Sequence, residues 1–200
     1  ASEMHDELGA GLSTIRLLSL AAKRHESDPT KSSRIDKIAQ SAADVMEKMA
    51  DIIWVMNSRN DSLENFIAYL RRYAGEYLET HEISLQFLKP DLIPAVSLSG
   101  EQRRNLLLAV KECLHNVVKH ANATTVRLEF TINGYVSINI ADNGVGMQES
   151  FLSLSSIPDN NLKSNGLNNL HYRMAAMGGS VIMENRQGLS VTLKTGLITK

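Results

Sequence analysis

The sequence contains one cysteine, Cys113, and this scarcity excludes a disulfide framework and a cysteine-rich metal site. A reducing compartment fits such cysteine usage best. Aromatic residues are also few, at 5%. No apolar run is long enough to span a bilayer, and no signal peptide is visible. We therefore expect a soluble globular protein, for which 43% hydrophobic and 22% charged residues are ordinary values.

An excess of charge of one sign is lacking as well. Lysine and arginine number 21 against 22 aspartate and glutamate residues, which gives a formal net charge of −1. Nucleic acids and anionic membranes attract proteins that carry a basic surplus, so we expect neither as the main partner.

The first part of the chain has the apolar spacing of two helices, at residues 3–26 and 31–58. We expect Asp28-Pro29-Thr30 to turn between them, because proline cannot continue a helix and disfavours helical backbone in the residue before it. Two helices cannot bury both apolar stripes by themselves. A second copy can complete a four-helix bundle, so the pattern predicts a homodimer through the N-terminal helices.

Residues 57–62 are polar and turn-rich and are expected to link a hairpin domain, residues 1–60, to a second domain, residues 61–200. In the second domain, Asn133-Gly134 predicts a tight hairpin between two alternating strands. Ser99 is expected to cap a helix that runs to about Ala121. Helices with a mostly antiparallel sheet make this domain α+β. The remaining expected elements are helices at 63–80 and 166–177 and strands at 83–87, 181–183 and 189–194.

One expected helix face carries unusual polar side chains. Glu112, Asn116 and His120 lie four residues apart, and Lys119 lies three after Asn116, so a helix brings them to one face. An amide oxygen can ligate Mg²⁺ beside phosphate oxygens, and lysine and histidine can meet the phosphates. Taken alone, a solvated helix face explains the pattern about equally well.

Two glycine-containing segments follow. Asp142, in DNGVGM, comes directly after a strand and can accept a hydrogen bond from an exocyclic amine such as that of adenine, while Gly144 and Gly146 allow close backbone approach. Gly166 opens a helix, and a helix N-terminus is a ready anion site. Taken singly, a plain β-turn and a simple capped helix explain these segments better.

Order and spacing are more specific than any single segment. An acid–amide helix, a hairpin ending in DxGxG, a serine-rich loop and a glycine opening a helix resemble the Bergerat-fold ATP-binding domain of histidine kinases, gyrase-type ATPases and Hsp90, over about residues 63–196. The resemblance implies an α/β sandwich that binds ATP and Mg²⁺. It assigns Asn116 as the Mg²⁺ ligand of the N box and residues 148–165 as the ATP lid. The other nucleotide-binding residues that it implies are Lys119 and His120 of the N box, Asp142, Gly144 and Gly146 of the G1 box, and Gly166, Leu167 and Leu170 of the G2 box.

The chain departs from this family near its C-terminus. Relatives often carry a glycine-threonine step before the last strand, whereas this chain reads QGLSVTL. Gly188 is present, but Ser190 or Thr192 would have to replace the threonine. We therefore assign no nucleotide contact there.

The N-terminal segment narrows the family. HDELG at the start of the first helix, with the ATP domain after it, resembles the sensor histidine kinases of the NarL/DesK-like class, and residues 52–74 look like their linker. The resemblance implies that His5 is the phosphoacceptor and that Asp6 orients it and takes its proton, with Glu7 the less favoured base. We expect Glu112 to be catalytic with them. A neutral imidazole is a competent nucleophile near neutral pH, because its reference pKa is about 6.5.

One position in the hairpin bears on dephosphorylation. Ala10 stands where many relatives have a glutamine that is associated with this activity, and a methyl group cannot orient water, so we expect weak phosphatase activity. The class implies a response regulator as partner, phosphotransfer to an aspartate of its receiver domain, and a hinge at residues 57–62. It also implies a cytoplasmic position and a sensor or membrane region upstream of residue 1. Two alternatives stay open: another Bergerat-fold ATPase or serine kinase, and a nucleotide-binding pseudokinase scaffold.

Overall fold

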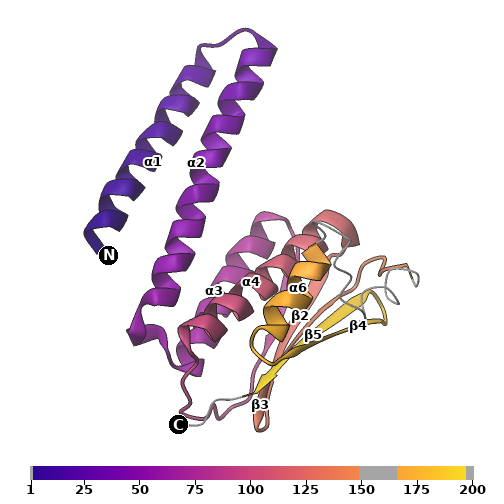
Figure 1. The fold of residues 1–200 in the computed structure, drawn as a ribbon. Helices are drawn as coiled ribbons and strands as arrows, with labels where there is room; N and C mark the ends of the chain where they lie inside the picture. Colours follow the sequence, from indigo (N-terminus) through magenta and orange to yellow (C-terminus); the bar gives the residue numbers. More distant parts are fainter. Residues whose placement is uncertain (1, 149–165, 197–200) are drawn as a thin grey trace. The chain divides into compact units, whose positions relative to one another are not determined.

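A computed structural model describes residues 2–148 and 166–196, with side chains from Leu8 onward except that of Leu167. The chain divides into two compact units, Ala1–Ser58 and Arg59–Lys200. Figure 1 shows the first unit as a pair of helices and the second as a sheet with helices along it.

The first unit is the helical hairpin that the apolar spacing predicts. It consists of α1, Ser2–Arg24, and α2, Pro29–Met56. The expectation that Pro29 lies inside a turn is wrong, because it is the first residue of α2, where its missing N–H breaks no helical hydrogen bond. Asp28 caps the helix by accepting a hydrogen bond from the backbone N–H of Thr30 at 2.8 Å.

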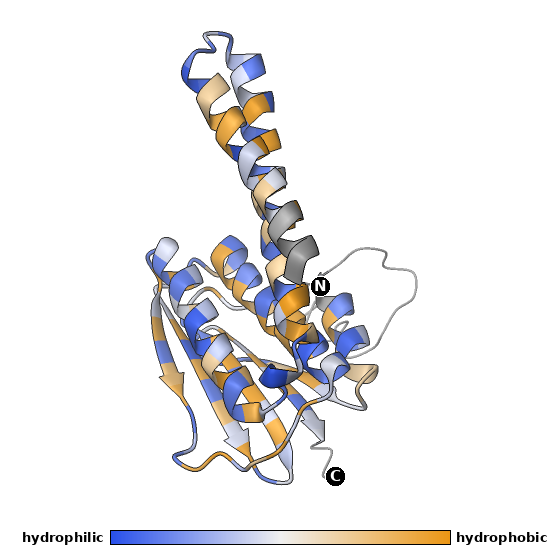
Figure 2. Ribbon diagram, turned by 90° about the vertical axis from the view of Figure 1, so that its left-hand side faces the viewer, coloured by the Kyte–Doolittle hydropathy of each residue, from blue (hydrophilic) through white to orange (hydrophobic). Residues whose placement is uncertain are grey.

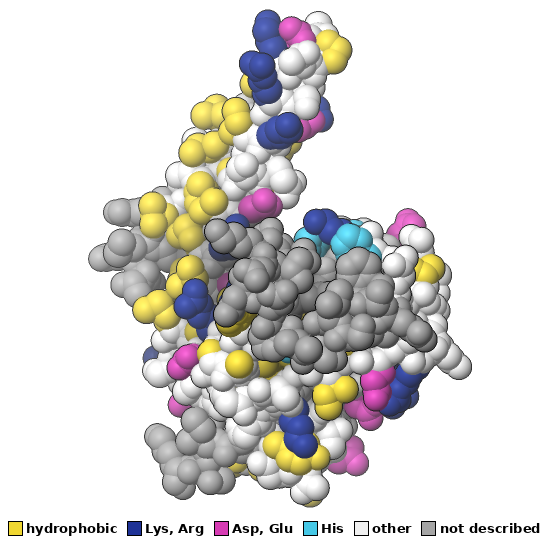
Figure 3. Space-filling model, turned by 45° about the vertical axis from the view of Figure 1, so that its right-hand side comes forward, with side chains coloured by type: hydrophobic (Ala, Val, Ile, Leu, Met, Phe, Trp, Pro, Cys, Tyr) yellow, Lys and Arg dark blue, Asp and Glu magenta, His cyan; other side chains and the backbone are white. Residues whose placement is uncertain are grey.

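The hairpin leaves much of its apolar surface uncovered within one copy of the chain. Ala39, Ala42 and Val55 of α2 are buried, whereas Ile38 and Ile52 keep 52% and 53% of their surface exposed. Figure 2 shows hydrophobic and hydrophilic residues alternating along both helices, and Figure 3 shows hydrophobic side chains on the surface of this unit. A search of the described residues finds no helix that is both long and apolar enough to cross a membrane.

Two helices of the second unit begin at capping serines, of which the sequence predicts Ser99. Ser62 accepts from the N–H of Asn65 at 3.1 Å, and Ser99 forms a reciprocal capping box with Gln102, at 3.1 and 2.9 Å. After the last of these helices the chain turns through Gly178, whose φ is +66°. The helical elements are η1, Ser58–Asn60, α3, Leu63–Thr80, α4, Gly100–Asn116, η2, Val117–Ala121, and α6, Gly166–Ala175.

The described residues of the second unit form a five-stranded sheet in the order β1-β2-β3-β5-β4. β1 pairs parallel with β2, since α4 carries the chain back between them, and the other pairs are antiparallel. Gly134, with φ of +68°, turns the hairpin between β2 and β3 as predicted. The last two strands are longer than expected. The strands are β1, Ser84–Leu88, β2, Thr125–Ile132, β3, Tyr135–Asp142, β4, Ser180–Asn185, and β5, Leu189–Gly196.

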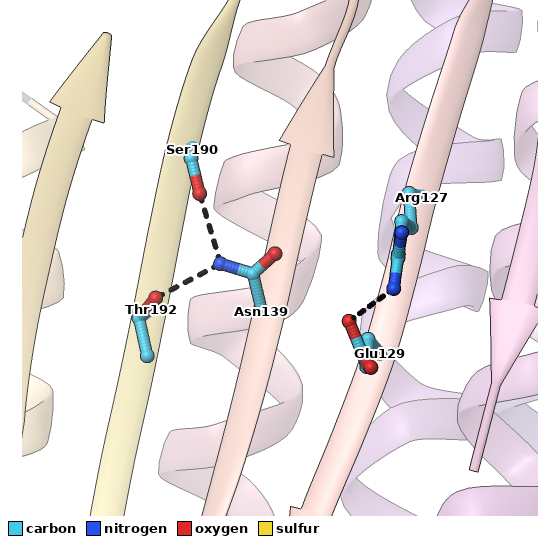
Figure 4. A network of polar contacts seen from close by, with 5 residues as sticks. All are labelled: Arg127, Glu129, Asn139, Ser190 and Thr192. Carbon is cyan, nitrogen blue, oxygen red and sulfur yellow. Dashed lines mark hydrogen bonds and ion pairs between the residues drawn. The ribbon is translucent and has the colours of Figure 1, made fainter. Parts of the chain in front are cut away.

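The two faces of the sheet differ. Helices α3, α4 and α6 cover one face (Figure 1), and the strands bury alternate residues such as Leu128, Ile138 and Leu193. Figure 4 shows polar side chains on the opposite face, where Nδ2 of Asn139 donates to the hydroxyls of Ser190 and Thr192, at 2.9 Å each. In the same view Arg127 pairs with Glu129 at 2.8 Å.

Candidate functional site

A cavity of about 580 Å³ lies where the end of α4, the turn η2, the loop after β3, the start of α6 and the start of β5 meet. This volume falls within the range of small-molecule sites, roughly 300–1,000 Å³. The residues lining the cavity are Cys113, Asn116, Val117, His120, Ala121, Ile140, Asp142, Gly146, Met147, Gln148, Gly166, Leu170, Leu189 and Val191.

The inner walls of the cavity are apolar. Ile140, Val191 and Leu170 are almost fully buried and come from β3, β5 and α6. Cys113 is buried beside them, and this burial raises the pKa of its thiol to about 12, with the nearby charge of Glu112 as the smaller cause. Walls of this kind suit a flat aromatic ring such as a purine.

Asp142 places a carboxylate at the edge of these apolar walls. It is the last residue of β3 and is 8% exposed. Its Oδ1 accepts hydrogen bonds from the backbone N–H groups of Gly144, at 2.8 Å, and Leu189, at 3.3 Å. Gly188 lies directly behind it, because a Cβ at that position would overlap the carbonyl oxygen of Asp142. The carboxylate is therefore fixed by its own loop and by the turn before β5.

The loop after Asp142 is braced at its start by the chain around β2. The side chain of Asn143 accepts from the N–H groups of Thr124 and Thr125, both at 2.9 Å. The N–H of Val145 donates to the carbonyl oxygen of Ala121 at 2.8 Å. A Cβ on Gly144 would overlap that same oxygen, so glycine is required for this approach.

The polar helix face predicted from the sequence is modified by its last turn. Residues 117–121 form a π-helical turn, which is wider than an α-helical one and is often found at functional sites. Asn116 and His120 both line the cavity, whereas Lys119 is exposed and is not among the residues that line its described part. Asn122 ends the turn in the left-handed conformation, with φ of +50°.

Gly166 begins α6 directly against Glu112. A Cβ on Gly166 would overlap the Oε1 atom of that carboxylate, so no larger residue fits there without displacing Glu112. Glu112 therefore lies at the N-terminus of α6, the helix predicted to contact the nucleotide. Glu112 itself does not line the cavity. Leu170, one turn further along α6, is 1% exposed and lines it.

Some predicted residues cannot be placed by their side chains. His5 and Asp6 lie in α1, in the first unit, and their side chains fall outside the described residues, as does that of Leu167. The predicted lid, 148–165, falls outside them too, apart from Gln148. The two units are described separately, so their roles in one reaction stay predictions.

Several lining residues were not predicted as site residues. Strand alternation places Ile140 and Val191 on the buried face of the sheet. It does not indicate that these two buried residues, rather than others of the same strands, line the cavity. Met147 has no local signal: its N–H donates at 2.9 Å to Oδ1 of Asn185, a residue 38 positions away in sequence that does not line the cavity. The other unpredicted lining residues are Cys113, Val117, Ala121 and Leu189.

Comparison with known families agrees with this architecture. Residues 101–197 match the family described as histidine kinase-, DNA gyrase B- and HSP90-like ATPase. Residues 1–61 match a second family, described as histidine kinase. The two matches together cover most of the chain, so a segment of the histidine kinase type is followed by an ATPase domain of the histidine kinase, DNA gyrase B and HSP90 type.

Individual relatives fit the same assignment. The sensor histidine kinase DesK of Bacillus subtilis is 28% identical over 96% of this chain, and the nitrate/nitrite sensor protein NarQ of Escherichia coli is 24% identical over 94%. The chain spans 49% of DesK and 32% of NarQ. The histidine kinase domain of a blue-light activated kinase from Erythrobacter litoralis has the same fold, with a TM-score of 0.61, 18% identity, and coverage of 98% of this chain and 94% of that domain.

Proposed function

We propose that this chain is the ATP-dependent core of a two-component sensor histidine kinase. It transfers the γ-phosphoryl group of ATP to His5 and then to an aspartate of a response regulator. The observation that carries the proposal is the cavity in which the N-box residue Asn116, the carboxylate of Asp142 and the glycine of α6, Gly166, come together. They do so in a chain whose first helix carries His5 beside two acids.

Asp142 is the residue that recognises adenine. Two backbone N–H groups bond its Oδ1, so the carboxylate is held in one orientation. Its Oδ2 accepts the hydrogen bond of the exocyclic amine, while Ile140, Val191 and Leu170 contact the ring. Gly144 and Gly146 let the loop approach the nucleotide, and Gly166, Leu167 and Leu170 form its border on α6.

The phosphates extend toward the end of α4. The amide oxygen of Asn116 is a hard ligand of the kind that Mg²⁺ accepts, and Lys119 and His120 supply positive charge or hydrogen bonds to the phosphate oxygens. Among the described residues no group of three or more histidine, cysteine, aspartate or glutamate side chains could hold a metal ion. Mg²⁺ bound here would therefore take its other ligands from the phosphates and water, as it does in many nucleotide enzymes. When bound, it offsets the charge of the phosphates.

In the phosphoryl transfer, one ring nitrogen of His5 forms a bond to the γ-phosphorus as the bond from that phosphorus to the bridging oxygen breaks, and ADP leaves. The proton on the other ring nitrogen is held, and then accepted, by the carboxylate of Asp6, with Glu7 the less favoured base. Glu112 assists from the nucleotide side. Residues 1–60 carry the acceptor histidine, and residues 61–200 bind the ATP that donates the phosphoryl group. The hinge at 57–62 lies between them.

The hairpin is also the proposed dimer interface and regulator-docking element. Ile38, Val45 and Ile52 lie seven residues apart on α2, and each keeps between 44% and 53% of its surface exposed. This spacing forms one stripe along a helix, and a second copy can cover it in a four-helix bundle.

In this proposal the chain is also the cytoplasmic part of a membrane-anchored sensor. Ala10 makes its phosphatase activity weak, so rapid phosphate release from a phosphorylated regulator incubated with this protein and ADP would contradict that point.

Autophosphorylation with γ-labelled ATP tests the central proposal. The wild-type protein should acquire label that is labile in acid and stable in base, and both His5→Gln and Asp142→Ala should lose it. His25→Gln, at an exposed histidine just beyond α1, is the matched control and should keep it. His5→Gln should still bind ATP, which separates loss of the acceptor from loss of the site. Label retained in both His5→Gln and Asp142→Ala would refute the assignment, and acid-stable label would favour a serine kinase.

A further inference from the structure

Asn185, the last residue of β4, makes an unusual contact with the loop that follows Asp142. Its side-chain amide engages both backbone groups of Met147. The N–H of Met147 donates to Oδ1 of Asn185 at 2.9 Å, and Nδ2 of Asn185 donates to the carbonyl oxygen of Met147 at 2.5 Å. A primary amide offers one donor and one acceptor side by side, so it can bond both groups at once, as a neighbouring strand would.

This contact holds the exit of the loop. The entry is braced elsewhere, by Asn143 and Val145. Gly146 has φ of +71°, and a Cβ there would lie 2.9 Å from Oδ1 of Asn185, so the glycine lets the loop pass close beside the amide. Met147 lines the cavity, whereas Asn185 does not. The position of this cavity wall therefore depends on a residue outside the cavity.

We infer that Asn185 is a positioning residue for nucleotide binding, which acts by fixing the backbone of Met147 in the conformation that ATP requires. The inference rests on the proposed ATP site. Removing the amide removes both hydrogen bonds to the backbone of Met147. ATP must then order this part of the cavity wall when it binds. Ordering a loop on binding weakens affinity without removing any direct contact to the ligand.

Asn139 provides a matched control. Its side chain also makes two hydrogen bonds, at 2.9 Å each, to Ser190 and Thr192 of the same sheet (Figure 4). It lies on the open face and does not line the cavity. Asn139→Ala thus removes the same number of amide hydrogen bonds as Asn185→Ala, but none that reaches the loop.

The test is calorimetric titration of the 200-residue protein with ATP at constant Mg²⁺, together with autophosphorylation kinetics. Asn185→Ala should raise the Kd and KM for ATP about tenfold, the effect of losing one or two net hydrogen bonds. Its kcat at saturating ATP should stay within about threefold of wild type, because the reacting groups are unchanged. Asn139→Ala should leave the Kd within about twofold of wild type even where it lowers Tm.

A second variant keeps the test decisive if Asn185→Ala does not fold. Asn185→Leu preserves the size of the side chain and removes both hydrogen bonds, so it should raise the Kd equally and speed hydrogen exchange at the Met147 amide. An unchanged Kd in either folded variant, or an equal rise in Asn139→Ala, overturns the inference while leaving the ATP site intact. A wild-type protein that does not bind ATP overturns the ATP site and this inference with it.

Discussion

Gly188 offers a sharp test of how the carboxylate of Asp142 is held in place. A Cβ at this position would lie 2.5 Å from Oδ1 of Asp142 and 2.7 Å from the backbone nitrogen of Gly144. Ordinary contact begins at 3.4 Å, so Gly188→Ala would push these atoms back by about 0.9 and 0.7 Å. The backbone carbonyl of Asp142 is closer still, and Asp142, which pairs with Val126 of β2, cannot retreat as a flexible side chain could.

We expect two separate effects of Gly188→Ala. Overpacking of a buried position should lower the free energy of unfolding by about 1–3 kcal/mol. For a chain of this size each kcal/mol corresponds to roughly 2–4 °C in Tm. Displacing the carboxylate that we propose binds adenine by nearly 1 Å should also weaken ATP binding, roughly ten- to hundredfold, since misplacement of that size is costly in a preorganised site.

Gly75→Ala is the matched control. Gly75 lies in α3, and a Cβ there would meet no atom within 4 Å. Alanine in a helix interior should stabilise the protein by about 0.5–1 kcal/mol. ATP affinity should not change in this variant. Thermal melting and ATP titration of the two variants beside wild type decide the matter: wild-type affinity in Gly188→Ala would refute the steric argument.

Three further outcomes follow from burial and exposure. Burial, with a smaller effect of the Glu112 charge, raises the pKa of Cys113 from 9.0 to about 12, so the folded state keeps a proton that the unfolded chain has lost. The free energy of unfolding should therefore fall as pH rises from about 9 toward 12, and urea melts of Cys113→Ala should show a shallower fall than wild type. Burial lowers the pKa of His171, whose Nε2 has no hydrogen-bond partner among the described residues. The unfolded state then binds the extra proton, so Tm should drop as pH falls below about 6.5, and an equal drop in His171→Gln would contradict this. Ile38→Glu should convert the proposed dimer to a monomer in sedimentation experiments with ATP affinity unchanged, whereas Lys48→Glu should leave that dimer intact.

Features with local causes could be predicted from the sequence. The helical hairpin, the cap at Ser99 and the turn at Gly134 each depend on residues within one or two turns of chain, and the structure confirms them. The sequence pattern places the start of α2 too late, because proline breaks helix interiors but its fixed φ also suits a first turn.

Features made by contacts between distant segments could not be predicted in this way. The order of motifs pointed to Asn116 and Asp142, but nothing local indicated that Cys113 and Met147 line the same cavity. Helical periodicity also does not indicate the π turn at residues 117–121. This turn widens the helix where the carbonyl oxygen of Ala121 accepts a hydrogen bond from the N–H of Val145. The sequence near Gly188 departs from the family pattern, so no motif predicts the close approach of Gly188 to Asp142.

The register of β5 connects these distant contacts. Ala141 of β3 pairs with Ser190 of β5, and this pairing sets Leu189 beside Asp142 and Gly188 behind it. Asn185 ends β4 opposite Leu189, and so it reaches the exit of the same loop. A slip of one residue in β5 would reverse the face of every side chain in the strand and remove the glycine from behind the carboxylate. The turn between β4 and β5 is thus part of the proposed nucleotide site, and substitutions within it should change ATP affinity more than their distance from the motif residues in sequence would indicate.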